Sequence, residues 1–137
     1  MRTKNRIKKA GALCIRHNKL LVVHKRGLED YITLGGKIEP GETPIRCLQR
    51  EVREEIGCSI RNPKYFATFL GLVNDSRGLS LRCYIVELKG NPKLNQYDSV
   101  DKYYWISCED YKKYKIPLAP LLKERIIPSL IERGLLK

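Results

Sequence analysis

The segment from Thr43 to Gly57 is the feature that most restricts how this chain can fold. Thr43 followed by Pro44 is a typical helix start, because the hydroxyl can cap the first turn and proline needs no N–H partner there. Gly57 suits the left-handed conformation in which many helices end. Between these ends, apolar residues recur with helical spacing, for example at Leu48 and Val52. The segment therefore predicts an amphipathic helix that packs one stripe on a core.

A second stripe of this helix carries three carboxylates, those of Glu51, Glu54 and Glu55. Like charges at this helical spacing repel one another, and their place near the C-terminal end opposes the helix dipole. The cluster therefore predicts a bound cation that prefers oxygen ligands, such as Mg²⁺ or Mn²⁺. The alternative is a solvated acidic face that forms surface ion pairs with the arginines of the same helix.

The loop before the helix is rich in glycine, at positions Gly35, Gly36 and Gly41. Because glycine has no Cβ, such a backbone can approach a ligand closely. Its carbonyl or amide groups can then point at a metal ion or an anion. Taken alone, a loop of this composition is more often a simple turn.

Together, the loop and the helix resemble the Nudix box, Gly-x5-Glu-x7-Arg-Glu-U-x-Glu-Glu-x-Gly-U, in which U is a bulky aliphatic residue. The residues that match the pattern at its spacing are Gly36, Glu42, Arg50, Glu51, Val52, Glu54, Glu55 and Gly57. The chain departs from the box at Cys58, which replaces the last aliphatic residue. It departs again before the box at Leu34, where many members have proline. The order of the other segments resembles a small single-domain Nudix protein of the MutT-like kind.

This resemblance implies an α/β fold, the Nudix α/β/α sandwich around a mixed β-sheet. We expect residues 1–137 to form one domain, with residues 1–8 as a basic N-terminal arm. Apolar runs and turn residues predict strands over 10–16, 20–24, 65–73, 79–88 and 103–106, and residues 31–34 are a short apolar piece before the glycines.

The connections and the C-terminal part are predicted from turn and capping residues. Residues 74–78 are expected to form a hairpin turn, and Ser107 to cap a helical turn that runs to residue 114. A C-terminal helix is expected to begin near Pro117, to bend at Pro128 and to end at Gly134.

The resemblance also implies a metal-dependent hydrolase that cleaves a pyrophosphate linkage in a nucleoside diphosphate derivative. Mg²⁺ is the implied cofactor, with Mn²⁺ as an alternative. The implied metal ligands are Glu51, Glu54, Glu55, Glu42 and the carbonyl of Gly35. Arg50 would hold a glutamate of the box in place. Either Glu51 or Glu54 would orient or deprotonate the attacking water.

Further candidate residues lie on both sides of the box. Arg26 ends the second predicted strand, where similar proteins bind a substrate phosphate, and Lys37 lies in the glycine-rich loop. Both are candidates for substrate binding, and the alternative is an exposed charge. Asp98 and Asp101 are candidates for a general base outside the box, or else solvated loop residues.

The substrate class is predicted mainly from the residues downstream of the box. Residues 72–76 contain neither the proline that marks ADP-ribose hydrolases nor the tyrosine that marks diadenosine polyphosphate hydrolases. We therefore expect a mutator-type (d)NTP pyrophosphatase. Hydrolysis of ADP-ribose or of another nucleoside diphosphate derivative is the alternative.

The charge of the chain keeps a second class of function open. It contains 27 Lys and Arg against 15 Asp and Glu, a net charge of +12, and no acidic residue precedes Glu29. This excess favours an anionic partner. The partner is a nucleotide, or else RNA, in which case the chain is a basic RNA-binding or RNA-end-processing module on a Nudix fold.

The cysteines and the apolar residues indicate where the protein works. Five cysteines without a C-x-x-C pair favour reduced thiols and a cytoplasmic location over a disulfide framework or a zinc site. No apolar run reaches the roughly 18 residues of a membrane span. We expect a monomer or a homodimer.

Overall fold

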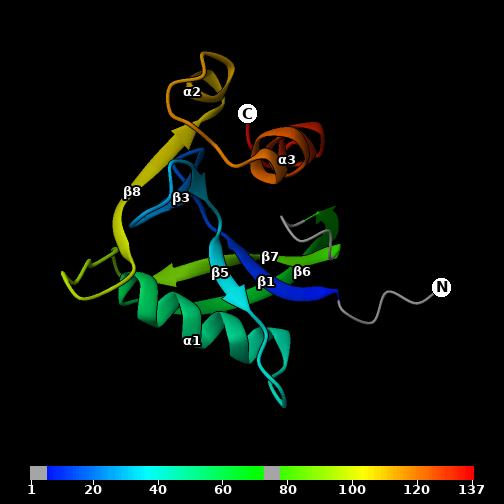
Figure 1. Ribbon diagram of the computed structural model, residues 1–137. Coiled ribbons are helices and arrows are strands. Elements are labelled where there is room, and N and C mark those ends of the chain that lie inside the picture. Colours follow the sequence, from blue (N-terminus) through cyan, green and yellow to red (C-terminus); the bar gives the residue numbers. More distant parts are fainter. Residues whose placement is uncertain (1–5, 73–77) are drawn as a thin grey trace.

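The computed structural model of this chain describes residues 6–72 and 78–137. In these ranges the strands form two sheets, shown in Figure 1. The first sheet has the order β5-β1-β7-β6, and its strands are Leu34–Lys37 (β5), Ile7–Leu13 (β1), Gly78–Lys89 (β7) and Ser59–Leu72 (β6). Strand β1 runs parallel to β7, whereas the other neighbours are antiparallel, so this sheet is mixed.

The second sheet is built around β3. Strand β3 pairs with three antiparallel neighbours, and the four strands are Lys19–Lys25 (β3), Ile15–Arg16 (β2), Tyr31–Ile32 (β4) and Val100–Ser107 (β8).

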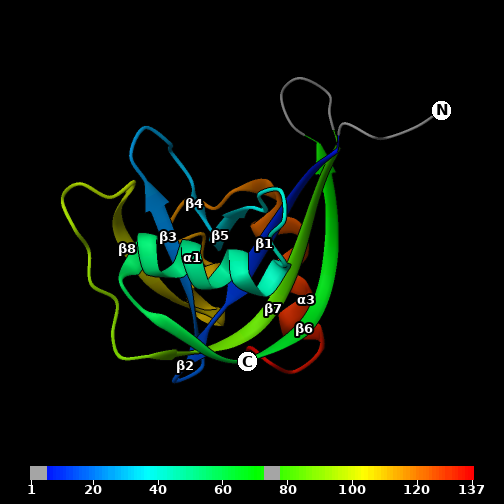
Figure 2. The same ribbon diagram turned by 90° about the horizontal axis from the view of Figure 1, so that it is seen from below.

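Helices cover both sides of the strands. The helix α1 (Pro44–Ile56) lies on one side, and the π-helical turn η1 (Leu122–Ile126) and the helix α3 (Ile127–Glu132) lie on the other, as Figures 1 and 2 show. A short helix, α2 (Cys108–Lys112), follows β8. The expected α/β/α arrangement around a mixed sheet is therefore confirmed.

Both ends of α1 are as predicted. The Thr43 side chain accepts a hydrogen bond from the Arg46 N–H at 3.2 Å, and Gly57 is left-handed with φ 67°. The apolar stripe, including Leu48 and Val52, is fully buried against the first sheet. This packing fixes the rotation of the helix and with it the direction of the acidic stripe.

One predicted strand is divided in the structure. The predicted strand 10–16 breaks at Cys14, because β1 belongs to the first sheet and β2 to the second. The apolar piece 31–34 contributes to two strands, β4 and β5. Strand β5 continues through Gly35, where a loop was expected. Gly35 has φ +125°, and a Cβ there would collide with the carbonyl oxygen of Ala10, so only glycine lets β5 approach β1 this closely.

The strand pairing after α1 agrees with the prediction, although the elements are longer. Strands β6 and β7 pair as an antiparallel hairpin with register shifts along β6. Of the predicted turn, residues 74–77 lie outside the described residues, and Gly78 begins β7. At the other end, β1 begins at Ile7 inside the segment predicted as a basic arm, of which residues 1–5 lie outside the described residues.

The last part of the chain differs more from its prediction. Ser107 caps α2 with a reciprocal contact to Asp110, as expected, but α2 ends at Lys112. The segment at Pro117 is not helical, because it runs beside β4 in a parallel bridge and its carbonyl accepts a 2.9 Å hydrogen bond from the Tyr31 N–H. Instead of a simple bend, a π-helical turn directly precedes α3, which contains Pro128 near its start.

Apolar residues are buried on both faces of the strands. One cluster lies between the sheets and α1, and another lies under α3. All five cysteines are unpaired and buried, as expected for small core residues. None of the helices in the described residues combines the length and the apolar character of a membrane span.

Candidate active site

The site is built where α1 crosses the glycines of β5. A Cβ on Gly36 would collide with the Glu51 carboxylate, so this glycine leaves the space in which Glu51 lies against the strand. One turn earlier, the Cys47 thiol is 3.5 Å from the carbonyl oxygens of Gly36 and Lys37. The acidic stripe of α1 is therefore held directly beside the backbone of β5.

Arg50 connects three of the box glutamates. Its guanidinium donates to both carboxylate oxygens of Glu42, at 2.7 and 2.9 Å, and contacts Glu51 at 2.9 Å and Glu54 at 3.2 Å. A further bond of 3.2 Å reaches the Lys37 carbonyl. This arginine lowers the pKa of Glu42 to about 2, so Glu42 stays ionised. The predicted role of Arg50, to hold box glutamates in place, agrees with these contacts.

Glu55 occupies the most buried position of the acidic stripe, with only 3% of the residue exposed. Its Oε1 accepts the Gly35 N–H at 2.9 Å, and its Oε2 lies 3.0 Å from the ammonium of Lys25. The second contact is an ion pair without the alignment of a hydrogen bond. Burial raises the pKa of Glu55 to about 7, and the charge of Lys25 and the Gly35 N–H oppose this rise.

The described residues contain no three Asp, Glu, His or Cys side chains that already converge on a metal ion. Arg50 and Lys25 instead compensate part of the charge, with two positive charges against the four carboxylates of Glu42, Glu51, Glu54 and Glu55. The donors nevertheless suit Mg²⁺ or Mn²⁺, because Glu51, Glu54 and Glu55 offer only oxygens. In addition, the buried Oε2 of Glu55 has no hydrogen-bond donor. The residues therefore fit a divalent ion.

Two further predicted ligands are Glu42 and the carbonyl of Gly35. Glu42 is bound on both oxygens by Arg50, and Gly35 contributes its N–H to Glu55. Their roles as ligands, like those of the three helix glutamates, stay predictions.

The predicted substrate-binding residues Arg26 and Lys37 lie at the edges of the site. Arg26 donates to the backbone carbonyls of Asp98 and Gln96, at 3.1 and 3.2 Å. Lys37 is exposed at the end of β5. Neither lines the cavity that opens beside the glycines of β5, and their role stays a prediction.

The two acids proposed from outside the box are in different surroundings. Asp98 lines an open hollow together with Glu54, at the C-terminal end of α1. Asp101 lies 2.6 Å from Nδ1 of His24, and this hydrogen bond lowers the pKa of its carboxyl group. Asp98 thus shares a hollow with a box glutamate, whereas Asp101 is paired with His24.

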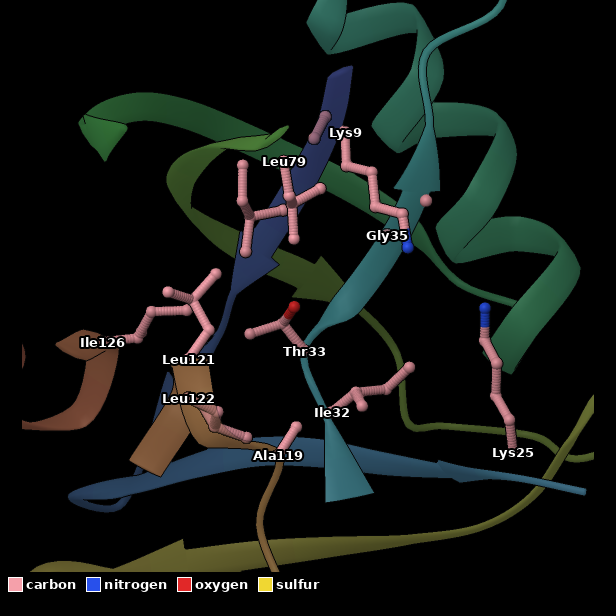
Figure 3. Close-up of a pocket in the computed structure, with 13 residues that line it drawn as sticks. Lys9, Lys25, Ile32, Thr33, Gly35, Leu79, Ala119, Leu121, Leu122 and Ile126 are labelled. Atoms are coloured by element: carbon pink, nitrogen blue, oxygen red, sulfur yellow. The ribbon is translucent and has the colours of Figure 1, made fainter. Parts of the chain in front are cut away.

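The cavity beside the glycines of β5 has a volume of about 150 Å³. Its lining, shown in Figure 3, is Lys9, Ala10, Lys25, Ile32, Thr33, Gly35, Gly36, Leu79, Leu81, Ala119, Leu121, Leu122 and Ile126. Leu121, Leu122 and Ile126 lie on one side of it, and the ammonium groups of Lys9 and Lys25 lie toward β5 and α1 on the other. The cavity thus joins an apolar wall to a cationic side that borders the acidic stripe.

Sequence reasoning favoured Arg26 at this end of β3, whereas the structure brings the neighbouring Lys25 to Glu55. The signal for Lys25 lies in the alternation of β3: Leu21 and Val23 face α1, and Lys25 continues the same face. The apolar wall from Ala119 onward carried no comparable signal, since a parallel bridge between Leu118 and Tyr31 positions the segment that leads to it.

Comparison with known proteins adds independent findings. The model of the NUDIX domain family matches residues 6–129. The NAD-capped RNA hydrolase NudC of Pseudomonas entomophila is 35% identical over 80 residues, which are 58% of this chain and 28% of that protein. The chain spans less than a third of the length of the curated NudC relatives that it matches.

Solved structures share the fold over nearly the whole chain. The E. coli ORF135 protein is 25% identical with a TM-score of 0.76, covering 95% of this chain and 92% of that chain. A MutT protein from Methanosarcina mazei Go1 is 18% identical with a TM-score of 0.77, and the match covers 93% of this chain and 95% of that chain. The second likeness concerns the fold alone.

The close contact between Gly36 and Glu51 yields a first prediction. We expect Gly36→Ala to reduce Mn²⁺ affinity and hydrolytic activity roughly 10- to 100-fold, because the new methyl group displaces the Glu51 carboxylate. Only the end of a flexible side chain must move, so the loss of unfolding free energy stays below about 2 kcal/mol. Titration with Mn²⁺ and urea unfolding measure the two effects.

Gly71→Ala is the matched control, because a Cβ at Gly71 meets its nearest atoms at an ordinary 3.9 Å. This variant should keep both metal affinity and stability. Equal metal affinity in Gly36→Ala and Gly71→Ala would contradict the assignment of Glu51 to the site.

The buried carboxyl of Glu55 yields a second prediction, for the metal-free protein in a chelator. Its pKa rises from 4.5 to about 7 on folding. In the pH range between these two values, the folded state therefore binds the proton more tightly than the unfolded state does. The wild type should therefore lose roughly 3 kcal/mol of unfolding free energy from this group as the pH rises through that window. Glu55→Gln, which cannot ionise, should lack this loss. Urea unfolding from pH 4 to 8 compares the two proteins, and parallel curves would show that Glu55 ionises normally.

Proposed function

Because the chain belongs to the NUDIX domain family and is a Nudix-type pyrophosphohydrolase, we propose that it cleaves a pyrophosphate linkage in a nucleoside triphosphate. The family generally uses divalent metals such as Mg²⁺, and the oxygen donors of α1 suit such an ion. The observation that carries the proposal is the position of the cavity, which borders Gly36 of the box and the preceding Gly35 on one side and an apolar wall on the other.

The cavity supports a substrate with one flat apolar part and one anionic part. Its volume of about 150 Å³ is near that of an apolar cavity that accepts a benzene ring, so it suits one base rather than a larger group. The wall of leucine and isoleucine would contact the faces of the base. Lys9 and Lys25 would attract the phosphates toward the acidic stripe.

The residues of α1 and β3 then have separate tasks. Glu51, Glu54 and Glu55 would hold the metal, which supplies charge neutralisation and lowers the pKa of a bound water. Arg50 keeps Glu42, Glu51 and Glu54 in a fixed arrangement through its 2.7 to 3.2 Å contacts. Glu51 or Glu54 would take the proton of the attacking water.

Lys25 would exchange partners during this reaction. In the structure it neutralises Glu55 at 3.0 Å and also lines the cavity. With Glu55 holding a metal ion, the Lys25 ammonium would be free to contact a phosphate of the substrate. The buried carboxylate is thus compensated both with and without a ligand.

A second candidate substrate is the pyrophosphate-linked 5′ end of an RNA. It is favoured by the net charge of +12 and by the relative named NAD-capped RNA hydrolase, which this chain matches in part. Products distinguish the candidates: incubation with a dNTP, ADP-ribose and NAD-capped RNA, each with Mg²⁺, is followed by mass spectrometry. We expect a nucleoside monophosphate and pyrophosphate from the dNTP, and faster turnover of RNA than of the dNTP would favour the second candidate.

Removal of one carboxylate charge tests the metal-binding role of α1. We expect Glu54→Gln to lower kcat for the preferred nucleotide roughly 10²- to 10³-fold, because an amide holds a divalent ion poorly. The fold should persist, since Glu54 is 56% exposed and contacts only Arg50 among the ion pairs of the described residues. Steady-state kinetics and circular dichroism measure the two outcomes.

Glu109→Gln is the matched control for this variant. Glu109 is also an exposed helical glutamate in an i,i+4 pair, 3.6 Å from Lys113, but it lies on α2. It should turn over substrate like the wild type. If Glu54→Gln also turned over substrate like the wild type, the assignment of Glu54 to the metal site would be contradicted.

The cavity yields a prediction of its own. Ala119 points into it from the apolar side, and Ala119→Leu would fill part of the space for the base. We expect KM for the nucleotide to rise roughly tenfold or more, which corresponds to a loss of about 1.4 kcal/mol of binding free energy. The affinity for Mn²⁺ should stay unchanged. A KM equal to that of the wild type would place the base elsewhere.

A further inference from the structure

The first sheet is covered by α1 over only part of its length. Ala12 and Val86 are buried under the helix, whereas the opposite end of the same face is exposed. In both ribbon views, the hairpin of β6 and β7 extends past α1. The uncovered end is called the open face here, and its exposed residues are Lys8, Tyr65, Thr68, Leu70 and Arg82.

The register places these residues on one side of the sheet. Thr68 is paired with Arg82, and Arg82 with Ala10, whose side chain faces α1. Leu70 and Lys8 are both paired with the next residue of that face, Ser80. Tyr65 is paired with Tyr84, which belongs to the cluster under α1. Paired residues point to the same side of a sheet, so the five exposed side chains form one surface.

The centre of the open face is an ordered stack of Arg82 on Tyr65. The guanidinium lies 4.5 Å from the ring centroid of Tyr65, and its Nε donates to the Tyr84 hydroxyl at 2.7 Å. The Tyr65 hydroxyl is 2.8 Å from that of Thr68, and its ring meets Tyr84 edge-on at 5.8 Å. Tyr65 is therefore held in place although 52% of it is exposed.

The open face is also cationic. Within the described residues, no carboxylate lies within 4.0 Å of the charged group of Arg82 or of Lys8. A second copy of this chain is disfavoured as the occupant, because a symmetric contact would bring these like charges together. An anionic partner with flat apolar groups fits both properties of the surface.

We propose that the open face binds single-stranded RNA, with a base stacked on Tyr65 and phosphates at Arg82 and Lys8. Exposed aromatic rings beside cationic groups are how proteins hold single strands without reading their sequence. We choose RNA because, under the second candidate of the proposed function, the substrate carries a strand beyond its pyrophosphate.

The open face is also near the hydrolytic site. Arg82, Ala10 and Gly36 lie in one row across three neighbouring strands. Two strand spacings, roughly 10 Å, therefore separate the backbone of Arg82 from that of the Nudix box. A bound strand would lie within a few nucleotides of the site.

The test measures RNA binding without hydrolysis. The full chain, in a chelator, is titrated against a fluorescent 12-nucleotide RNA that has no 5′ phosphate, and anisotropy gives Kd at several salt concentrations. We expect Tyr65→Ala to weaken binding roughly 5- to 150-fold. Tyr97→Ala, which removes a tyrosine that is 85% exposed in a distant loop, should bind like the wild type.

Charge is tested separately from stacking. Arg82→Ala should lower the slope of log K against log salt by roughly 0.7, the share of one phosphate contact on a single strand. Arg82→Lys should keep that slope. Lys89→Ala, at the other end of β7, should leave both affinity and slope unchanged.

Nucleotide hydrolysis and the melting temperature of each variant are measured in parallel, so that a failure of RNA binding is distinguished from a failure of the catalytic site or of folding. The proposal is overturned if the wild type does not bind the RNA at low salt, or if Tyr65→Ala binds as the wild type does. It is also overturned if the same sequence as DNA binds more tightly, or if Tyr65→Ala instead abolishes a concentration-dependent dimer.

Discussion

The close approach of α1 and β1 to the backbone of β5 is the constraint on which the site depends. Gly35 and Gly36 make it possible, because a Cβ at either position would collide with Ala10 or with Glu51. The approach aligns the acidic stripe of α1 with the strand and lets the Gly35 N–H reach Glu55 at 2.9 Å. The same two glycines border the cavity, so one packing contact positions both the carboxylates and the space for a ligand.

Placing carboxylates in this contact requires compensation of their charge. Two cations supply part of it, and they come from different elements: Arg50 from α1 itself and Lys25 from the end of β3. Arg50 holds the outer carboxylates in a fixed array at the surface. Lys25 reaches the one buried carboxylate, where desolvation is strongest and an unpaired charge is most costly. The acidic cluster therefore keeps an excess of negative charge, and its oxygens suit a divalent ion.

Local sequence signals predicted the elements whose causes are local. The two ends of α1 follow from Thr43 and Gly57, and the cap of α2 follows from Ser107, because capping groups act within a few residues. The predictions failed where distant pairing decides the structure. The break of the first strand at Cys14 depends on which sheet each half joins, and the extended backbone at Pro117 depends on a hydrogen bond from Tyr31. No pattern within a short window contains these partners.

The same division holds for the site. The spacing of Glu51, Glu54 and Glu55 along a helix determined by itself that three carboxylates share one stripe, and the box pattern identified the family. Only the tertiary structure decided that Lys25 rather than Arg26 faces these carboxylates, that Arg50 binds Glu42 on both oxygens, and that an apolar wall from the C-terminal segment closes the cavity. Spacing along one helix is set by its own geometry, whereas contacts between elements depend on how buried surfaces pack, and residues far apart in the chain determine that packing.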